Sequence, residues 1–195
     1  MSWSDKMVKA SEAVSRLAVW VGGISILFVT LLISAEIILR KFFGISTGGI
    51  DEISGYALAI SFSWALSYTL LRRAHIRIDA IYNRLPNTFR PFLDCLSIAS
   101  MSVFALVLTF FSFMVVVDTV ELGARSTTTL ETPLWIPQVL WLGGFILFSF
   151  NCCLLTFAGV ASLFDRDFER VRELIGSRTT DEEIASETPK MQNEI

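Results

Sequence analysis

Few residues of this sequence could do chemistry, and the first of them is an acid inside an apolar segment. Glu36 is the one charged residue of residues 17–39, where a carboxylate could couple the movement of a proton or a cation to transport. Arg40 follows four positions later, so on a helix the two side chains can meet, about 6 Å apart along the axis. This spacing near the segment's end favours a structural ion pair or a partner contact over an ion-coupling site.

Patterns for catalysis or metal binding do not occur in the sequence. With a single histidine, His75, the chain cannot supply both ligands of a bis-histidine haem, and no catalytic triad can be argued there. Cys95, Cys152 and Cys153 lie in or beside apolar segments and have neither zinc spacing nor a disulfide framework. The sequence therefore predicts neither an enzyme nor a cofactor, and its net charge of −3 predicts no nucleic-acid partner.

Two charged clusters flank the apolar segment 53–71. Asp51 and Glu52 precede it, either as first-turn acids that the helix dipole stabilises or as a contact for a basic patch on another subunit. The string RRAHIRID follows, at residues 72–79. Phospholipid headgroups explain its arginines, but they do not explain why His75 and Asp79 are four positions apart. A hydrogen bond between these two side chains would explain that spacing.

The elements that position these groups are four apolar segments, residues 17–39, 53–71, 92–117 and 136–164. Each is long enough to cross the hydrocarbon core of a bilayer as a helix. A hydrophobic content of 53% and a mean hydropathy of +0.58 are typical of a membrane protein. The predicted fold is an all-α membrane protein with four transmembrane helices.

The remaining segments are polar. Residues 1–16 form an N-terminal flank, and residues 165–195 form a tail whose distal part, without an apolar period, is predicted to be disordered. Between the second and third spans, apolar residues recur at helical spacing up to Pro86, which predicts a short interfacial helix. Basic residues gather in the flank, in residues 72–91 and in the proximal tail, so the positive-inside rule puts both termini in the cytoplasm.

Two features inside the spans predict helix packing. Gly55, Ala59, Ser63 and Ser67 recur every four positions and form a stripe along which another helix could approach closely, although a lipid-facing helix could also carry small residues by chance. Asn151 lies near the middle of the fourth span, where an unsatisfied amide would be costly in lipid. We expect Asn151 to face another helix.

In this layout the chain resembles the small membrane subunit of tripartite ATP-independent periplasmic (TRAP) transporters, the DctQ type, over about residues 15–165. The resemblance rests on Glu36 and Arg40 followed by two phenylalanines, and on the acidic pair that opens the second span. It rests also on the HIRID string at 75–79 and on TPLWIP at 132–137. The chain departs from the family at residues 48–50, Gly-Gly-Ile, where an aromatic residue is frequent.

The resemblance implies an accessory subunit in the inner membrane of a bacterial cell. Such a subunit braces a large elevator-type permease subunit, which takes up an organic acid with sodium after a periplasmic binding protein delivers it. The large subunit, the binding protein and the phospholipid bilayer are then the expected partners. The candidates for partner contacts are Glu36, Arg40, Asp51, Glu52, Gly55, Ala59, Ser63, Arg73, His75, Asp79, Trp135 and Asn151.

Two other functional classes stay open at this point. One is a self-sufficient small four-helix exporter that uses Glu36 for coupling. The other is a membrane anchor for a different complex.

Overall fold

A computed structural model describes residues 3–44, 48–73, 90–165, 171 and 175–176 of the chain. These residues form four helices: α1 (Trp3–Phe43), α2 (Ile50–Leu71), α4 (Arg90–Glu121) and α5 (Trp135–Phe164). No named strand occurs among them, and only an isolated bridge joins Arg125 to Pro133 in the loop before α5. The all-helical class predicted from the sequence is confirmed.

Three of these helices are long and apolar enough to cross a membrane: α1 from Ala10 to Phe43, α4, and α5. The shorter α2 is not among them, because serines and polar-tipped aromatic residues lower its hydropathy. The fourth crossing and the cytoplasmic termini therefore stay predictions. The predicted interfacial helix and the predicted disordered distal tail lie outside the described residues.

The helices extend beyond the apolar segments. Helix α1 begins in the polar flank, fourteen positions before the predicted span, and α4 runs on to Glu121. A helix bonds its own backbone and so needs no boundary where the apolar sequence stops. A contact with another helix holds the third turn of α1: Glu12 forms an ion pair with Arg72 at the end of α2, with 3.5 Å between the charged groups.

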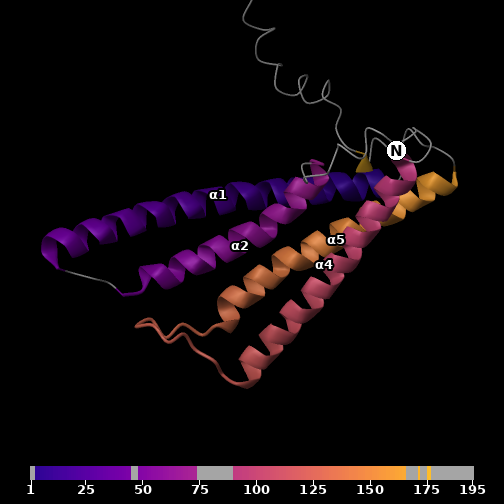
Figure 1. Cartoon of the computed structure of the whole chain (residues 1–195). Coiled ribbons are helices and arrows are strands. Elements are labelled where there is room, and N and C mark those ends of the chain that lie inside the picture. The colour runs from indigo at the N-terminus through magenta and orange to yellow at the C-terminus, as the bar shows by residue number, and fades with distance from the viewer. Residues whose placement is uncertain (1–2, 45–47, 74–89, 166–170, 172–174, 177–195) are drawn as a thin grey trace, which may run out of the picture.

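The four helices form a row, in the order α1, α2, α5, α4 (Figure 1). Helix α1 packs along α2, α2 along α5, and α5 along α4, while α1 meets α5 over a shorter stretch. Within the chain, 44% of the apolar window of α5 is buried, against 11% for α1. The inner helices are therefore covered by protein, and the edge helices leave broad apolar faces open.

The main core lies where the end of α2, the start of α4 and the end of α5 converge. Leu70, Cys95, Phe148 and Leu155 contribute to it. Val171 and Ile175, four positions apart in the sequence beyond α5, are buried in the same cluster. Gly159 makes room for Ile175, because a Cβ atom there would lie 2.7 Å from Cδ1 of Ile175.

Replacing Gly159 with leucine is expected to displace Ile175 from this core. Overpacking of this kind typically costs about 1–3 kcal/mol. Thermal unfolding of the purified chain in detergent measures the loss. Gly23→Leu is the matched control, because nothing lies within 4 Å of a Cβ atom at that helical glycine. Equal stability of the two variants would contradict the docking of Ile175.

Candidate partner interface

Small residues bring α1 and α2 into close contact. A Cβ atom at Gly22 would lie 3.1 Å from Cβ of Ser61. The hydroxyl of Ser61 lies 3.2 Å from the carbonyl oxygen of Gly22, to which it donates, and 3.1 Å from the hydroxyl of Ser25. Since lipid supplies no hydrophobic drive between helices, close approach and hydrogen bonds of this kind hold them together.

Helix α2 approaches α5 still more closely on its other side. A Cβ atom at Gly144 would lie only 2.7 Å from the backbone carbon of Ser63, and Ser63 and Ser67 are fully buried. The indole of Trp64 donates to the carbonyl oxygen of Leu140 at 2.9 Å. The inner half of the predicted small-residue stripe is thus used inside the chain.

Hydroxyl pairs join α4 to α5. The side-chain oxygens of Thr109 and Ser149 are 2.7 Å apart, and those of Ser102 and Thr156 are 2.6 Å apart. Hydrogen bonds between membrane helices contribute on average about 0.6 kcal/mol each. These pairs therefore fix the register of the two helices more than they determine stability.

The outer half of the stripe, towards the loop before α2, is open. Gly55 and Ala59 are exposed, and a Cβ atom at Gly55 would meet nothing within 4 Å. Leu58 and Phe62, beside them on α2, are also more than half exposed, at 61% and 62%. This surface of small and apolar residues is the part of α2 that the chain itself does not cover.

The acidic pair in the first turn of α2 divides between two environments. Glu52 accepts hydrogen bonds from the hydroxyl of Tyr56 at 2.7 Å and from that of Thr128, in the loop before α5. Partial burial pulls the pKa of Glu52 upward, but donated hydrogen bonds pull it further down, so the pKa lies below its ordinary value. Asp51 is exposed.

Two glycines allow the loops at this end to meet. Gly48 has a φ of +68°, and a Cβ atom there would lie 3.0 Å from the hydroxyl of Thr129. At Gly49 a Cβ atom would come within 2.6 Å of Cγ of Leu130. A side chain at Gly49 would collide with the loop before α5, and one at Gly48 would be crowded by Thr129 in a strained backbone conformation. This gives a physical reason for the Gly-Gly-Ile sequence here.

The predicted contact of Glu36 with Arg40 is confirmed. Their charged groups are 3.2 Å apart, and the Glu36 side chain is 9% exposed against 60% for Arg40. A carboxylate so covered needs a neighbouring cation, which Arg40 supplies. The geometry fits a structural ion pair at the end of α1.

Asn151 faces another helix, as expected, and that helix is α1 of the same chain. Asn151 is fully buried, and its side-chain oxygen accepts a hydrogen bond of 2.6 Å from the hydroxyl of Ser11. Among the described residues, its amide nitrogen and the hydroxyls of Ser15 and Ser67 have no hydrogen-bond partner.

The other candidates lie at the ends of helices or outside the described residues. Trp135 begins α5 and is 47% exposed. Arg73, with a φ of 54°, follows the end of α2. His75 and Asp79 lie outside the described residues, so their predicted pairing stays a prediction. In the described part of the chain, no group of three or more metal-ligating side chains occurs.

Sequence reasoning missed some of the residues that position these contacts. Gly144 lies in a Gly-Gly pair within an apolar helix, a signal of close approach that was available. Ser11 and Thr128 carry no comparable signal, because each meets its acceptor across a large separation in sequence.

Glu52→Gln is expected to loosen the loop 126–131. An amide keeps the shape of the side chain but loses the charge that strengthens the hydrogen bonds. Hydrogen exchange of this loop should become several-fold faster in the variant. Because the pKa of Glu52 is lowered in the folded chain, its stabilising effect is present at neutral pH and is lost as the pH falls through the folded-state pKa. The wild type should therefore show faster exchange at acidic pH, after correction for intrinsic rates.

Asp51→Asn is the control for this experiment, because it removes the adjacent charge without removing a contact to the loop. If both variants exchange at the wild-type rate, Glu52 does not hold the loop.

The family described as "Tripartite ATP-independent periplasmic transporters, DctQ component" matches residues 28–162. This range runs from within α1 to the last turn of α5. It includes the contacts of α5 with α2 and with α4 described above, whereas Gly22 and Ser25, which meet Ser61 from α1, precede it. Comparison with curated proteins and with solved structures gives no match.

Proposed function

The chain belongs to the DctQ component family of tripartite ATP-independent periplasmic transporters, and we propose that it braces the large subunit of such a transporter in the membrane. The family is a transporter component rather than a family of enzymes. In our proposal the large subunit moves an organic acid together with sodium, and a periplasmic protein delivers that acid. This chain carries neither substrate nor ion.

The observation that carries the proposal is the open row of helices. Apolar side chains face outward along both edge helices, with Trp20 at 69% exposed on α1 and Phe111 at 62% on α4. The hydroxyls of α4 and α5 described above are bonded to one another between the helices. A flat plate of helices with a mostly paired interior suits a structural support, whereas a transport pathway needs polar groups facing a cavity.

The low hydropathy of α2 is compatible with a fourth crossing. Helix α2 lies between α1 and α5, and its polar residues Ser61, Ser63 and Ser67 are buried against those neighbours. In a membrane, polar side chains are tolerated where protein covers them. We therefore propose that α2 crosses the membrane as well, with both termini in the cytoplasm.

The exposed half of the stripe on α2 is our candidate for the contact with the large subunit. A partner helix could approach closely at Ala59, where the side chain is small and exposed, and pack against Phe62. The ion pair of Glu36 with Arg40 favours this structural role over an exporter that couples through Glu36, because the carboxylate is already held by a cation.

Deleting the chain is expected to abolish uptake by the remaining transporter. An elevator-type subunit needs a fixed support against which to move, and the proposed role supplies it. Uptake of the delivered organic acid into cells that keep the large subunit and the binding protein measures the effect. Undiminished uptake without this chain would refute the bracing role.

Ala59→Leu is expected to lower recovery of the large subunit about tenfold when this chain is purified in detergent. The leucine would hold the partner helix away, and a loss of about 1.4 kcal/mol corresponds to this factor. The matched control is Ala161→Leu, at another exposed alanine on α5. Equal recovery with both variants would exclude this surface of α2 from the interface.

A further inference from the structure

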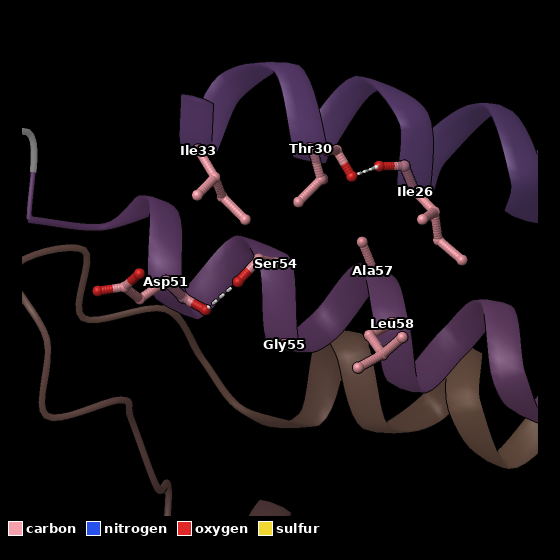
Figure 2. Close-up of a pocket in the computed structure, with 9 residues that line it drawn as sticks. Ile26, Thr30, Ile33, Asp51, Ser54, Gly55, Ala57 and Leu58 are labelled. Carbon is pink, nitrogen blue, oxygen red and sulfur yellow. Dashed lines mark hydrogen bonds between the residues drawn. The ribbon is translucent and has the colours of Figure 1, made fainter. Parts of the chain in front are cut away.

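The outer halves of α1 and α2 enclose a groove that no contact within the chain fills. The two helices touch at Gly22 and Ser61, and beyond this contact a space of about 290 Å³ opens between them. Figure 2 shows side chains of α1 pointing into this space across from α2. Its lining is Ile26, Val29, Thr30, Ile33, Asp51, Ser54, Gly55, Ala57 and Leu58.

The walls of the groove present alkyl surface. The two hydroxyls of its lining are bonded within their own helices: Thr30 donates to the carbonyl oxygen of Ile26 at 2.8 Å, and Ser54 donates to that of Asp51 at 2.7 Å. Neither hydroxyl needs a partner in the groove. Gly55 adds no side chain, so α2 leaves room there. The occupant that such walls favour is a hydrocarbon.

One end of the groove carries a negative charge. Asp51 lies there, at the start of α2 (Figure 2), and in the described part of the chain its carboxylate forms no ion pair. Because Asp51 opens the helix, this end lies at the predicted membrane boundary, with the apolar groove leading inward from it. The occupant therefore combines a hydrocarbon chain with a cation at the boundary.

The dimensions exclude a helix. The groove follows α2 from Asp51 to Leu58, about 10 Å along the axis at 1.5 Å per residue. Its volume of about 290 Å³ is well below the roughly 800–1,100 Å³ that 10 Å of a helix about 10–12 Å across would occupy. A single extended alkyl chain fits this volume.

We propose that the groove binds one acyl chain of an amine-headed phospholipid, whose ammonium group pairs with Asp51. The lipid comes from the leaflet on the side of the loop before α2, which is the periplasmic leaflet in the proposed topology. An anionic lipid without an amine is disfavoured, because its headgroup would lie beside the carboxylate. The site uses residues of this chain alone and so does not depend on contact with a large subunit.

The test measures which phospholipid the purified full chain retains. The chain is exchanged into detergent micelles with equal amounts of phosphatidylethanolamine and phosphatidylglycerol and examined by native mass spectrometry. The wild type should retain one phosphatidylethanolamine, at least fivefold more than phosphatidylglycerol. Asp51→Asn should abolish that preference. Ala57→Phe, which fills the groove from α2, should lower retention at least fivefold, whereas Ala161→Phe outside the groove should leave it unchanged.

A second measurement needs no variant. Phosphatidylethanolamine with a photoreactive group in its acyl chain should label peptides that contain residues 26–33 and 54–58. Equal retention of both lipids by the wild type, unchanged retention in Ala57→Phe, or labelling elsewhere would each overturn the proposal. If Ala57→Phe lowers recovery of a large subunit and leaves lipid retention unchanged, the occupant is protein and the proposal is wrong.

The test of lipid binding is independent of the test of the proposed bracing role. Lipid retention is measured on the chain alone, and recovery of the large subunit is measured with Ala59→Leu, a residue outside the groove lining. Either result can fail without the other.

Discussion

The structure depends on the close approach of α2 to a neighbour on each side. On one side the backbone of α1 approaches at Gly22, and on the other the backbone of α5 approaches at Gly144; both glycines meet serines of α2. Between helices in lipid the hydrophobic effect contributes little, so dispersion contacts and hydrogen bonds at short separation must hold them. Glycine opposite serine allows the close approach on both sides. Ser61 also donates a hydrogen bond to α1, whereas the hydroxyl of Ser63 is bonded within α2 and Trp64 donates the hydrogen bond to α5.

The row of helices and its surfaces follow from these contacts. With α2 and α5 in the middle, polar groups such as Ser63 and Asn151 are buried by protein, and the edges of the row are left apolar. Because α1 and α2 are fixed at Gly22 and Ser61 but diverge beyond that point, a narrow groove remains at their outer ends. The contacts of α2 with α1 and α5 thus produce a buried interior and two broad apolar faces for lipid or a partner subunit. They also leave the space that we assign to a phospholipid.

Charged groups are restricted to the ends of the row, where they join segments that are distant in sequence. Glu52 connects the start of α2 with the loop before α5, and Glu12 connects the start of α1 with the end of α2. Ion pairs and charge-assisted hydrogen bonds near a membrane boundary involve a smaller desolvation cost than those at the bilayer centre. They can therefore orient loops and helix ends without destabilising the spans.

The sequence by itself determined the helical class, the approximate position of each apolar helix and the family, because helix length, hydropathy and the contact of Glu36 with Arg40 are local properties. It also indicated that another helix packs against α2 and that Asn151 faces a helix. Only the tertiary structure decided which neighbours these are: α5 covers Ser63 and α1 meets Asn151, while Gly55 and Ala59 stay exposed. A stripe of small residues indicates that the backbone of another helix can come close, but it does not indicate which helix this is. That choice depends on the order of helices in space, which arises from contacts between residues far apart in the chain.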